Sequence, residues 1–447
     1  MKKHCYTPIF CFSLVAIILL TASRASAQDV TKAEINLTLA QIWEQASANN
    51  KKIRANQLLV QSSAELVKDA KSERLPEIQV EGEYARVSNM PIYNNGFFSA
   101  PGHFNVLHNS YAVGGDAYFN IYEGKNTNTK IQEEKKEHEI KEVQQLATIA
   151  DVKLNAAAFY LDLMRSIVFR KLMLYDIAEE EKQLKEIKTL LQNGVVLKSD
   201  VLRDELKLSR EKVALLEIEN DITIANQKLQ LICGLPAGMQ IIPGDHTENF
   251  ITHDDVVDAY ITEGTESSYA VRISEKETSL KKLNIKAVKG NLAPKIGLFA
   301  NYAISYPQIR FYPYEGSAYG LGMYGIKASF AIDGFYHNKH KTAAAVLDYQ
   351  SQELEHADTE DILHQQITEG YLRYKEALTK IDVARTNVKQ ASENYRIVKN
   401  TYFNQLSLIT DLLDADTQVL QTQFDLAAAQ IAAQFKYYQL QRVTGKL

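Results

Sequence analysis

The chain has 447 residues, and its 55 acidic side chains outnumber its 50 basic ones, which gives a formal net charge of −5. This balance argues against a nucleic-acid-binding protein, which usually carries a basic surface. After the N-terminal segment there is no apolar run of ~18 residues, so no helix is expected to cross a bilayer, although β-strands could still enter one.

Residues 1–27 have the layout of a secretory signal peptide. Lys2 and Lys3 form a basic start, residues 9–20 are apolar, and a small-residue Ala-Ser-Ala sequence ends at Ala27. The apolar run is too short for a good membrane span. We therefore expect a secreted chain; a cytoplasmic protein with an apolar N-terminal helix is the alternative.

Cleavage after Ala27 changes both the charge and the cysteine content. It removes three basic residues, which takes the formal charge to −8, and it removes Cys5 and Cys11. Cys233 is then the one cysteine left, so no intrachain disulfide can form. No cysteine follows the cleavage site to carry a lipid anchor.

Two stretches contain neither glycine nor proline, residues 125–193 and 371–444. Proline costs ~3 kcal/mol inside a helix and glycine ~1 kcal/mol, so these absences permit very long helices. About 65 helical residues span roughly 100 Å, which exceeds the size of a compact domain. Two apolar rows with three- and four-residue spacing predict coiled-coil packing: Leu215, Ile218, Ile222, Ala225, Leu229 and Ile232, and Leu420, Phe424, Ala427, Ile431, Phe435 and Tyr438.

Four other segments have the period-two alternation of β-strands. In the first, Ile78, Val80 and Tyr84 lie on one face and Gln79 on the other; in the third, Ile296, Leu298 and Tyr302 are in phase, and Lys327 blurs the phase of the fourth. The strands are predicted at 77–87, 111–122, 295–306 and 319–332, in two hairpins (about 77–122 and 295–332) with loops at about 88–110 and 307–318.

The chain also repeats itself. With a shift of 218 residues, "RLPEIQVEGEYA" (74–85) falls on "LAPKIGLFANYA" (292–303), and with a shift of 211, "NGVVLKSDVL" (193–202) falls on "NQLSLITDLL" (404–413). We expect two copies of one unit, at 28–236 and 237–447. Each would contain a helix, a hairpin, a long helix, a turn (193–199 or 404–410) and a second helix.

Four strands cannot close a barrel, and an open sheet edge is not tolerated in lipid. The sheet must therefore be completed by other copies of the chain, and the long helices need the same neighbours. These arguments predict a homo-oligomeric tube.

The signal peptide, the duplicated unit, the Leu-Pro before the first hairpin and the "GVVLKSDVL" turn resemble the TolC-like outer-membrane efflux protein family. The resemblance covers residues 37–445. It implies an α+β membrane protein: a homotrimer with a coiled-coil α-helical barrel in the periplasm and a transmembrane β-barrel of four strands per chain in outer-membrane lipid. It implies export with a periplasmic adaptor and an inner-membrane transporter of the RND, ABC or MFS type, and no cofactor.

The resemblance also implies site residues. Asp411 and Asp414 match acidic residues that line the closed periplasmic mouth, where three copies would gather six carboxylates; helix-start acids are the alternative. Asp416 is expected to be solvated or to face a partner. Tyr402 and Asp200 match a pair that ties the gate shut, whereas Ser407 stands where a basic residue would form a second tie.

Two apolar turns are candidate docking tips for the adaptor. An alternative is that their leucines cap the coiled coil. The residues that the resemblance assigns to docking are Gly194, Val195 and Leu197 in the first turn, and Leu406 and Leu408 in the second.

Two other classes of protein are alternatives. An enzyme lacks support, because HExxH, GxSxG and phosphate-binding glycine motifs are missing. His337 and His340 form an HxxH pair, for which two solvated histidines at a strand-to-helix junction are expected rather than a metal site. A secreted coiled-coil adhesin or pore-forming protein would explain the long helices but not the two hairpins. The sequence does not specify the exported substrate or the transporter type.

Overall fold

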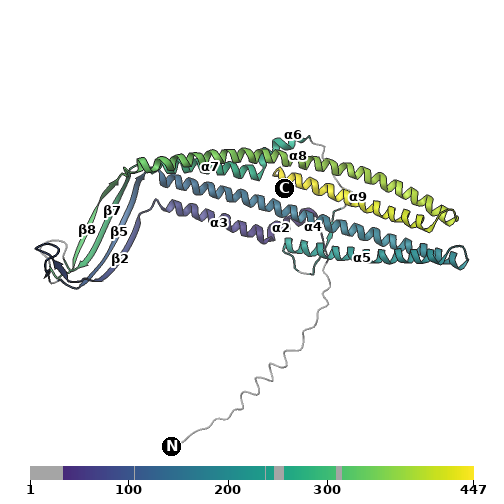
Figure 1. Ribbon diagram of the computed structural model, residues 1–447, viewed down its shortest axis with the longest axis horizontal. Helices are drawn as coiled ribbons and strands as arrows, with labels where there is room; N and C mark the ends of the chain where they lie inside the picture. Colours follow the sequence, from purple (N-terminus) through teal and green to yellow (C-terminus); the bar gives the residue numbers. More distant parts are fainter. Residues whose placement is uncertain (1–33, 105, 237, 246–255, 309–314) are drawn as a thin grey trace, which may run out of the picture.

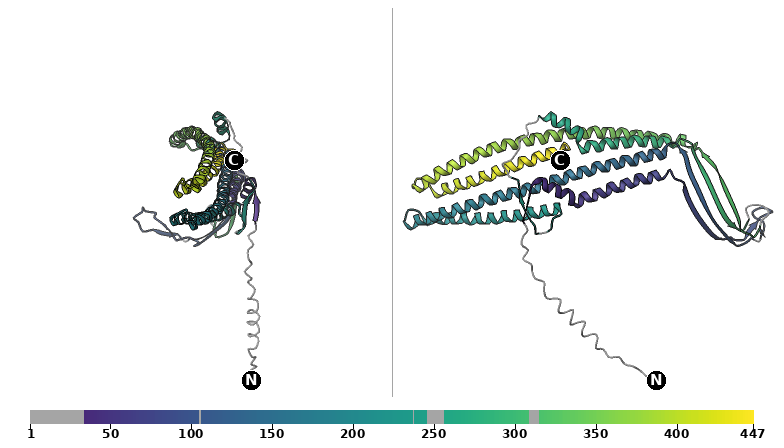
Figure 2. Two further views of the ribbon diagram at one scale, coloured as in Figure 1. Left: turned by 90° about the vertical axis from the view of Figure 1, so that its right-hand side faces the viewer. Right: turned by 180° about the vertical axis from the view of Figure 1, so that it is seen from behind.

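The computed structural model describes residues 34–104, 106–236, 238–245, 256–308 and 315–447. The protein is strongly elongated, with a β-sheet at one end and two helical tips at the other (Figure 1). Viewed along its length, the helices follow an arc rather than a closed bundle (Figure 2). The predicted signal peptide lies outside the described residues.

Two very long helices form the backbone of this shape, α4 (Asn126–Gln192, 67 residues) and α8 (Gly334–Phe403, 70 residues). The first matches the stretch without glycine or proline. The second begins much earlier than position 371 and runs through Gly370. A Cβ at this position would be 3.4 Å from Leu440, so the glycine lies where the neighbouring helix is close. Packing along α8 therefore outweighs the helix cost of glycine.

Each long helix turns back at its tip into a shorter one, α5 (Lys198–Cys233) after α4 and α9 (Ile409–Val443) after α8. Each pair is packed along its length, and α4 also packs on α9. All twelve residues of the two predicted apolar rows are buried or half-buried, which confirms them as packing seams.

Four shorter helices lie beside the long ones: α2 (Leu39–Asn49) and α3 (Lys51–Ser72) pack on α4, and α6 (Val257–Ser267) and α7 (Tyr269–Gly290) pack on α8. Strands β1 (Glu34–Leu37) and β6 (Gln240–Pro243) pair in parallel near the middle of the molecule.

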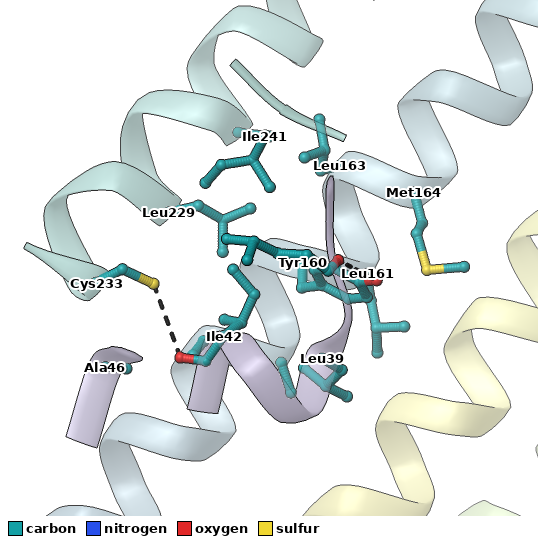
Figure 3. Close-up of a cluster of buried hydrophobic side chains, with 14 of the residues drawn as sticks. Leu39, Ile42, Ala46, Tyr160, Leu161, Leu163, Met164, Leu229, Cys233 and Ile241 are labelled. Carbon is teal, nitrogen blue, oxygen red and sulfur yellow. Dashed lines mark hydrogen bonds between the residues drawn. The ribbon is translucent and has the colours of Figure 1, made fainter. Parts of the chain in front are cut away.

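A hydrophobic core surrounds Tyr160 at this level (Figure 3). The Tyr160 hydroxyl lies 2.8 Å from Asp245 Oδ2 and 3.1 Å from the Leu37 carbonyl oxygen, so its one hydrogen can be donated to either acceptor. Cys233 is buried in the same core, and its thiol lies 3.8 Å from the Ile42 carbonyl oxygen. Burial raises the pKa of this thiol to about 11, so Cys233 behaves as a packed apolar side chain.

The main sheet has four antiparallel strands in the order β2 (Glu77–Arg86), β5 (Asn109–Glu123), β7 (Lys295–Tyr306) and β8 (Tyr319–Ser329). The two predicted hairpins are confirmed, and pairing of β5 with β7 joins them into one sheet.

The bounds of β2 and β5 differ from the prediction by one or two residues, and two larger details differ as well. Strand β8 ends at Ser329 rather than at 332, because a turn closed by the Gly334 amide and the Ala331 carbonyl starts α8. The predicted loop at 88–110 contains a small hairpin of its own, β3 (Met90–Ile92) and β4 (Gly102–Phe104).

The register gives the sheet two different faces. Val80 is aligned with Gly115, Tyr302 and Gly322 across the four strands, on the apolar face. The neighbouring row contains Gln79, Asp116, Asn301 and Met323. The apolar face is exposed: along β2, Ile78, Val80 and Tyr84 have 74, 79 and 71% of their surface accessible.

Lys327 is aligned with Gly297 and lines the same hollow as Glu77, so it belongs to the polar face. The two outer strands, β2 and β8, each have one edge without a strand partner among the described residues.

Candidate functional site

The two helical tips are built by the same local structure. In the first, α4 ends at Gln192 with Asn193 as its C-cap, Gly194 adopts φ of 73°, and the Val195 amide donates to the Leu190 carbonyl at 2.9 Å. In the second, Gln405 adopts φ of 63° and the Leu406 amide donates to the Thr401 carbonyl at 2.8 Å. Both turns therefore satisfy the last helix carbonyls with a left-handed residue.

The returning helices also begin alike. The Leu197 amide donates to Asp200 Oδ2 at 3.4 Å, and the Leu408 amide donates to Asp411 Oδ2 at 3.1 Å. A carboxylate in the first turn also interacts favourably with the helix dipole. Asp411 thus stabilises the start of its own helix, as the alternative interpretation of this residue expected, and Asp200 does the same in the other hairpin.

The tips expose large apolar side chains. Leu197, Leu406 and Leu408 are 71, 78 and 69% exposed, and Val195 is 40% exposed. The arrangement does not bury the leucines against the coiled coil of the chain itself. An exposed apolar surface at the end of a soluble helical hairpin is typical of an interaction site.

The three aspartates near the start of α9, Asp411, Asp414 and Asp416, lie in different environments. Asp414 is exposed and has no hydrogen-bond or ion-pair partner among the described residues. Of the two environments expected for Asp416, the solvated one is wrong, because this side chain is buried and forms an ion pair with Lys207 of α5. The helix turn carries Asp414 outward and Asp416 toward the other hairpin.

The predicted gate tie is not formed in this structure. The Tyr402 hydroxyl is buried and, among the described residues, has no hydrogen-bond partner. Burial and the charges of Asp200 and Asp204 raise the pKa of Tyr402 to about 12, so the phenol stays protonated at neutral pH. Asp200 lies close enough to act on Tyr402 electrostatically, but its oxygens accept hydrogen bonds from Leu197 and Ser199.

A cluster of buried carboxyl groups lies behind the tips and was not predicted from the sequence. It includes Glu180 of α4 and Asp204 of α5, which are 2 and 0% exposed. Charged residues on long helices ordinarily face solvent. The periodicity could have identified Asp204, because it lies three residues after the buried Val201 and four before the buried Leu208.

His337 and His340 are both exposed in the first turns of α8. In the part of the chain that the structure describes, no three His, Cys, Asp or Glu side chains are grouped to hold a metal ion. In that same part, no helix has the length and apolarity needed to cross a membrane.

Comparison with known families identifies the fold. The family model described as "Outer membrane efflux protein" matches residues 42–235 and 266–446, which is most of the chain. The chain belongs to the outer membrane efflux protein family. Among curated proteins, none matches its sequence.

Solved structures of outer-membrane channels have the same fold. The channel OprN matches with a TM-score of 0.74 and 14% identity, covering 92% of this chain and 90% of OprN. VceC from Vibrio cholerae matches with a TM-score of 0.72 and 13% identity (91 and 96% covered). The open-state MtrE channel of Neisseria gonorrhoeae matches with a TM-score of 0.72 and 15% identity (91 and 88% covered).

Membership of the efflux family confirms the predicted class of function. The protein is an outer-membrane efflux protein with the fold of outer-membrane channels. The family is one of transport proteins rather than enzymes, and the alternative of a secreted adhesin or pore-forming protein finds no support.

Proposed function

We propose that the protein is a homotrimer in which three four-stranded sheets form one barrel of twelve strands in the outer membrane. The observation that carries this proposal is the open sheet: β2 and β8 are its unpartnered edges among the described residues, and its apolar face is exposed. Unpaired backbone groups are too costly in lipid, so β2 of one subunit must pair with β8 of the next. The arc of helices, which extends from one end of the sheet, would close into a tunnel by the same symmetry (Figure 2).

The two repeats belong to this proposal. The family model matches the chain in two segments, and the two hairpins have equivalent tips. Units at 28–236 and 237–447 would give the trimer six similar helical hairpins around its mouth.

The apolar tips would dock a periplasmic adaptor, which joins the channel to an inner-membrane transporter of the RND, ABC or MFS type. Their exposure supports this role: Leu197, Leu406 and Leu408 have no apolar cover in their own chain. Export would then run from the transporter through the tunnel and the barrel.

The oligomer can be tested in detergent. The purified mature chain should migrate as a trimer before heating and as a monomer after it. A monomer under both conditions, with native helix content by circular dichroism, would contradict the barrel.

Docking can be tested separately by export from cells. Leu197→Asp or Leu408→Asp should abolish export while the trimer level stays unchanged, because a carboxylate cannot replace an apolar contact. Leu197→Met and Leu408→Met keep the tips apolar and should export normally. Export by both Asp variants would place the adaptor contacts elsewhere.

A further inference from the structure

A group of acidic side chains lies inside the tip half of the molecule, between the two helical hairpins. It contains one lysine, Lys207, contributed by α5. We call this group the carboxyl cluster; its acids are Asp176 and Glu180 of α4, Asp204 and Glu211 of α5, and Asp416 of α9.

Lys207 is the centre of the cluster. Its Nζ donates to Glu180 Oε2 at 2.9 Å and forms ion pairs with Glu211 Oε1 at 3.3 Å and with Asp416. Burial opposes the ammonium charge, but Asp416 and Glu180 outweigh this effect and raise the pKa of Lys207. The pair with Asp416 joins the α4/α5 hairpin to α9.

One lysine cannot satisfy five carboxyl groups. With every carboxyl group ionised, five buried oxygens have no hydrogen-bond partner among the described residues: both of Asp204, Oε1 of Glu180, Oε2 of Glu211 and Oδ2 of Asp176. A buried ionised carboxylate without a partner is strongly unfavourable, and such a group takes up a proton instead. With every acid ionised, five negative charges would face one positive charge.

The carboxyl groups are arranged so that protons can be shared. Glu180 contacts Asp204, and Asp176 contacts Glu211; two carboxyl groups can hydrogen-bond only if one carries a proton. Burial raises the pKa of Asp176 to about 7, with the charges of Asp416 and Glu211 adding to the effect. Burial also raises the pKa values of Glu180 and Glu211.

The remaining helix, α8, does not neutralise the cluster. Its Lys399 donates to the Tyr395 hydroxyl at 3.4 Å, and this hydroxyl donates to Gln183 Oε1 at 3.4 Å. Burial and the charge of Asp416 raise the pKa of Tyr395, so the phenol stays neutral.

Helix packing alone does not require these acids. A shift of 211 residues places Glu180 on Ala391 and Asp204 on Ala415, and both alanines are buried, at 5 and 4% exposure. At these two positions the second hairpin therefore packs methyl groups where the first hairpin buries carboxyl groups.

We propose that the carboxyl cluster is a proton-binding site that holds the two helical hairpins together and loosens when its shared protons leave. While Glu180 and Asp176 carry protons, Lys207 is free to act as the cationic partner of Asp416. Without those protons Asp416 faces up to four carboxylates on the other hairpin, which repel α9. Any effect on the tunnel mouth rests on the proposed function.

The direction of the pH response follows from the raised carboxyl pKa values. The closed cluster binds protons more tightly than solvated carboxyl groups do, so its stabilisation is complete below their ordinary pKa values. This stabilisation is lost as the pH rises through the raised pKa values of the cluster. The pKa of Asp176 is about 7, and the pKa of Glu180 is also above its ordinary value. Opening should increase up to about tenfold per pH unit for each proton released.

Hydrogen–deuterium exchange of the full mature protein in detergent tests this response. After correction for intrinsic rates, peptides covering 198–211 and 409–420 should open at least about tenfold more at pH 8 than at pH 6. Peptides of α3 serve as the internal reference.

The double variant Asp176→Asn/Glu180→Gln keeps the shapes of the two side chains and replaces each shared proton with an amide hydrogen that does not titrate. This variant should change less than twofold over the same range. Glu180→Ala with Asp204→Ala, which copies the second hairpin, should lower the response as well.

Glu181→Ala is the matched control, because Glu181 pairs with Lys212 at 2.7 Å across the same helices but is exposed; it should respond as the wild type does. The proposal is overturned if the wild-type protein shows no pH response. It is also overturned if Asp176→Asn/Glu180→Gln responds to pH as strongly as the wild type does. Restored protection at pH 8 on adding Mg²⁺ would also overturn it, in favour of a cation site. Loss of the proposed export function would appear only in the export assay and leave the exchange response intact.

Discussion

Gln405 occupies in the second tip the left-handed backbone position that Gly194 occupies in the first, with φ of 63° against 73°. The hydrogen bonds that close the two turns are equivalent, from Leu406 to Thr401 and from Val195 to Leu190. A side chain with a Cβ pays ~1–2 kcal/mol in this conformation, whereas glycine does not. The second tip is therefore the more strained of the two.

Exchanging these residues should change stability in opposite directions. Gln405→Gly should stabilise the protein by about 1 kcal/mol, and Gly194→Ala should destabilise it by a similar amount. A Cβ at Gly194 would meet no atom within 4 Å, so the cost would come from the backbone alone. Thermal unfolding followed by circular dichroism measures both. Shifts of the same sign would refute the strain argument.

The long helices and the strands could be predicted because their signals are local. Absence of glycine and proline permits a helix of the length of α4, and alternation over ten residues identifies β2 and β7. The β5/β7 pairing that joins the hairpins could not be predicted, because it depends on which edges meet in three dimensions.

The environment of Asp416 shows the same limit within the site. Its partner Lys207 is 209 residues away in the sequence, and the local sequence pattern at neither position predicts the contact. Asp416 lies only two residues beyond Asp414, yet one side chain is buried and the other exposed. Which helix face meets the neighbouring hairpin is decided by how the hairpins pack.

The two faces of the sheet give a prediction for membrane insertion. Val80→Arg should lower the yield of heat-resistant oligomer strongly, because arginine on a lipid-facing strand position costs about 2–4 kcal/mol near the membrane centre. Gln79→Arg is the matched control, one residue away on the polar face with Asp116 and Asn301. Equal losses in the two variants, measured by gel migration without heating, would contradict the assigned faces.

A substitution of Tyr402 distinguishes two roles for this residue: a hydrogen bond to Asp200 that holds the channel closed, or packing in the helical core. Its hydroxyl is buried and has no hydrogen-bond partner among the described residues, and such a group costs about 1–3 kcal/mol. Tyr402→Phe should therefore raise the thermal stability by about 1 kcal/mol and leave the conductance in a planar bilayer unchanged. Lower stability with a higher conductance would instead show that Tyr402 ties to Asp200 in the assembled channel.

The last prediction concerns Asp411 and Asp414, the proposed ring of charge at the periplasmic mouth. The structure separates their roles: Asp411 accepts the Leu408 amide at 3.1 Å, whereas Asp414 is exposed and has no partner among the described residues. In a trimer both would gather six carboxylates in a narrow mouth, and crowded carboxylates attract cations.

Asp414→Asn should therefore lose more of the cation preference than Asp411→Asn, without loss of stability. Asp411→Asn keeps an oxygen that can accept the Leu408 amide but removes the charge beside the helix start, so it should cost about 0.3–1 kcal/mol. The double variant should lose most of the preference and bind divalent cations poorly. Reversal potentials in a salt gradient across a planar bilayer measure selectivity for all three variants. If the double variant keeps the wild-type reversal potential, both aspartates are helix-start residues in solvent and the mouth is formed by other side chains.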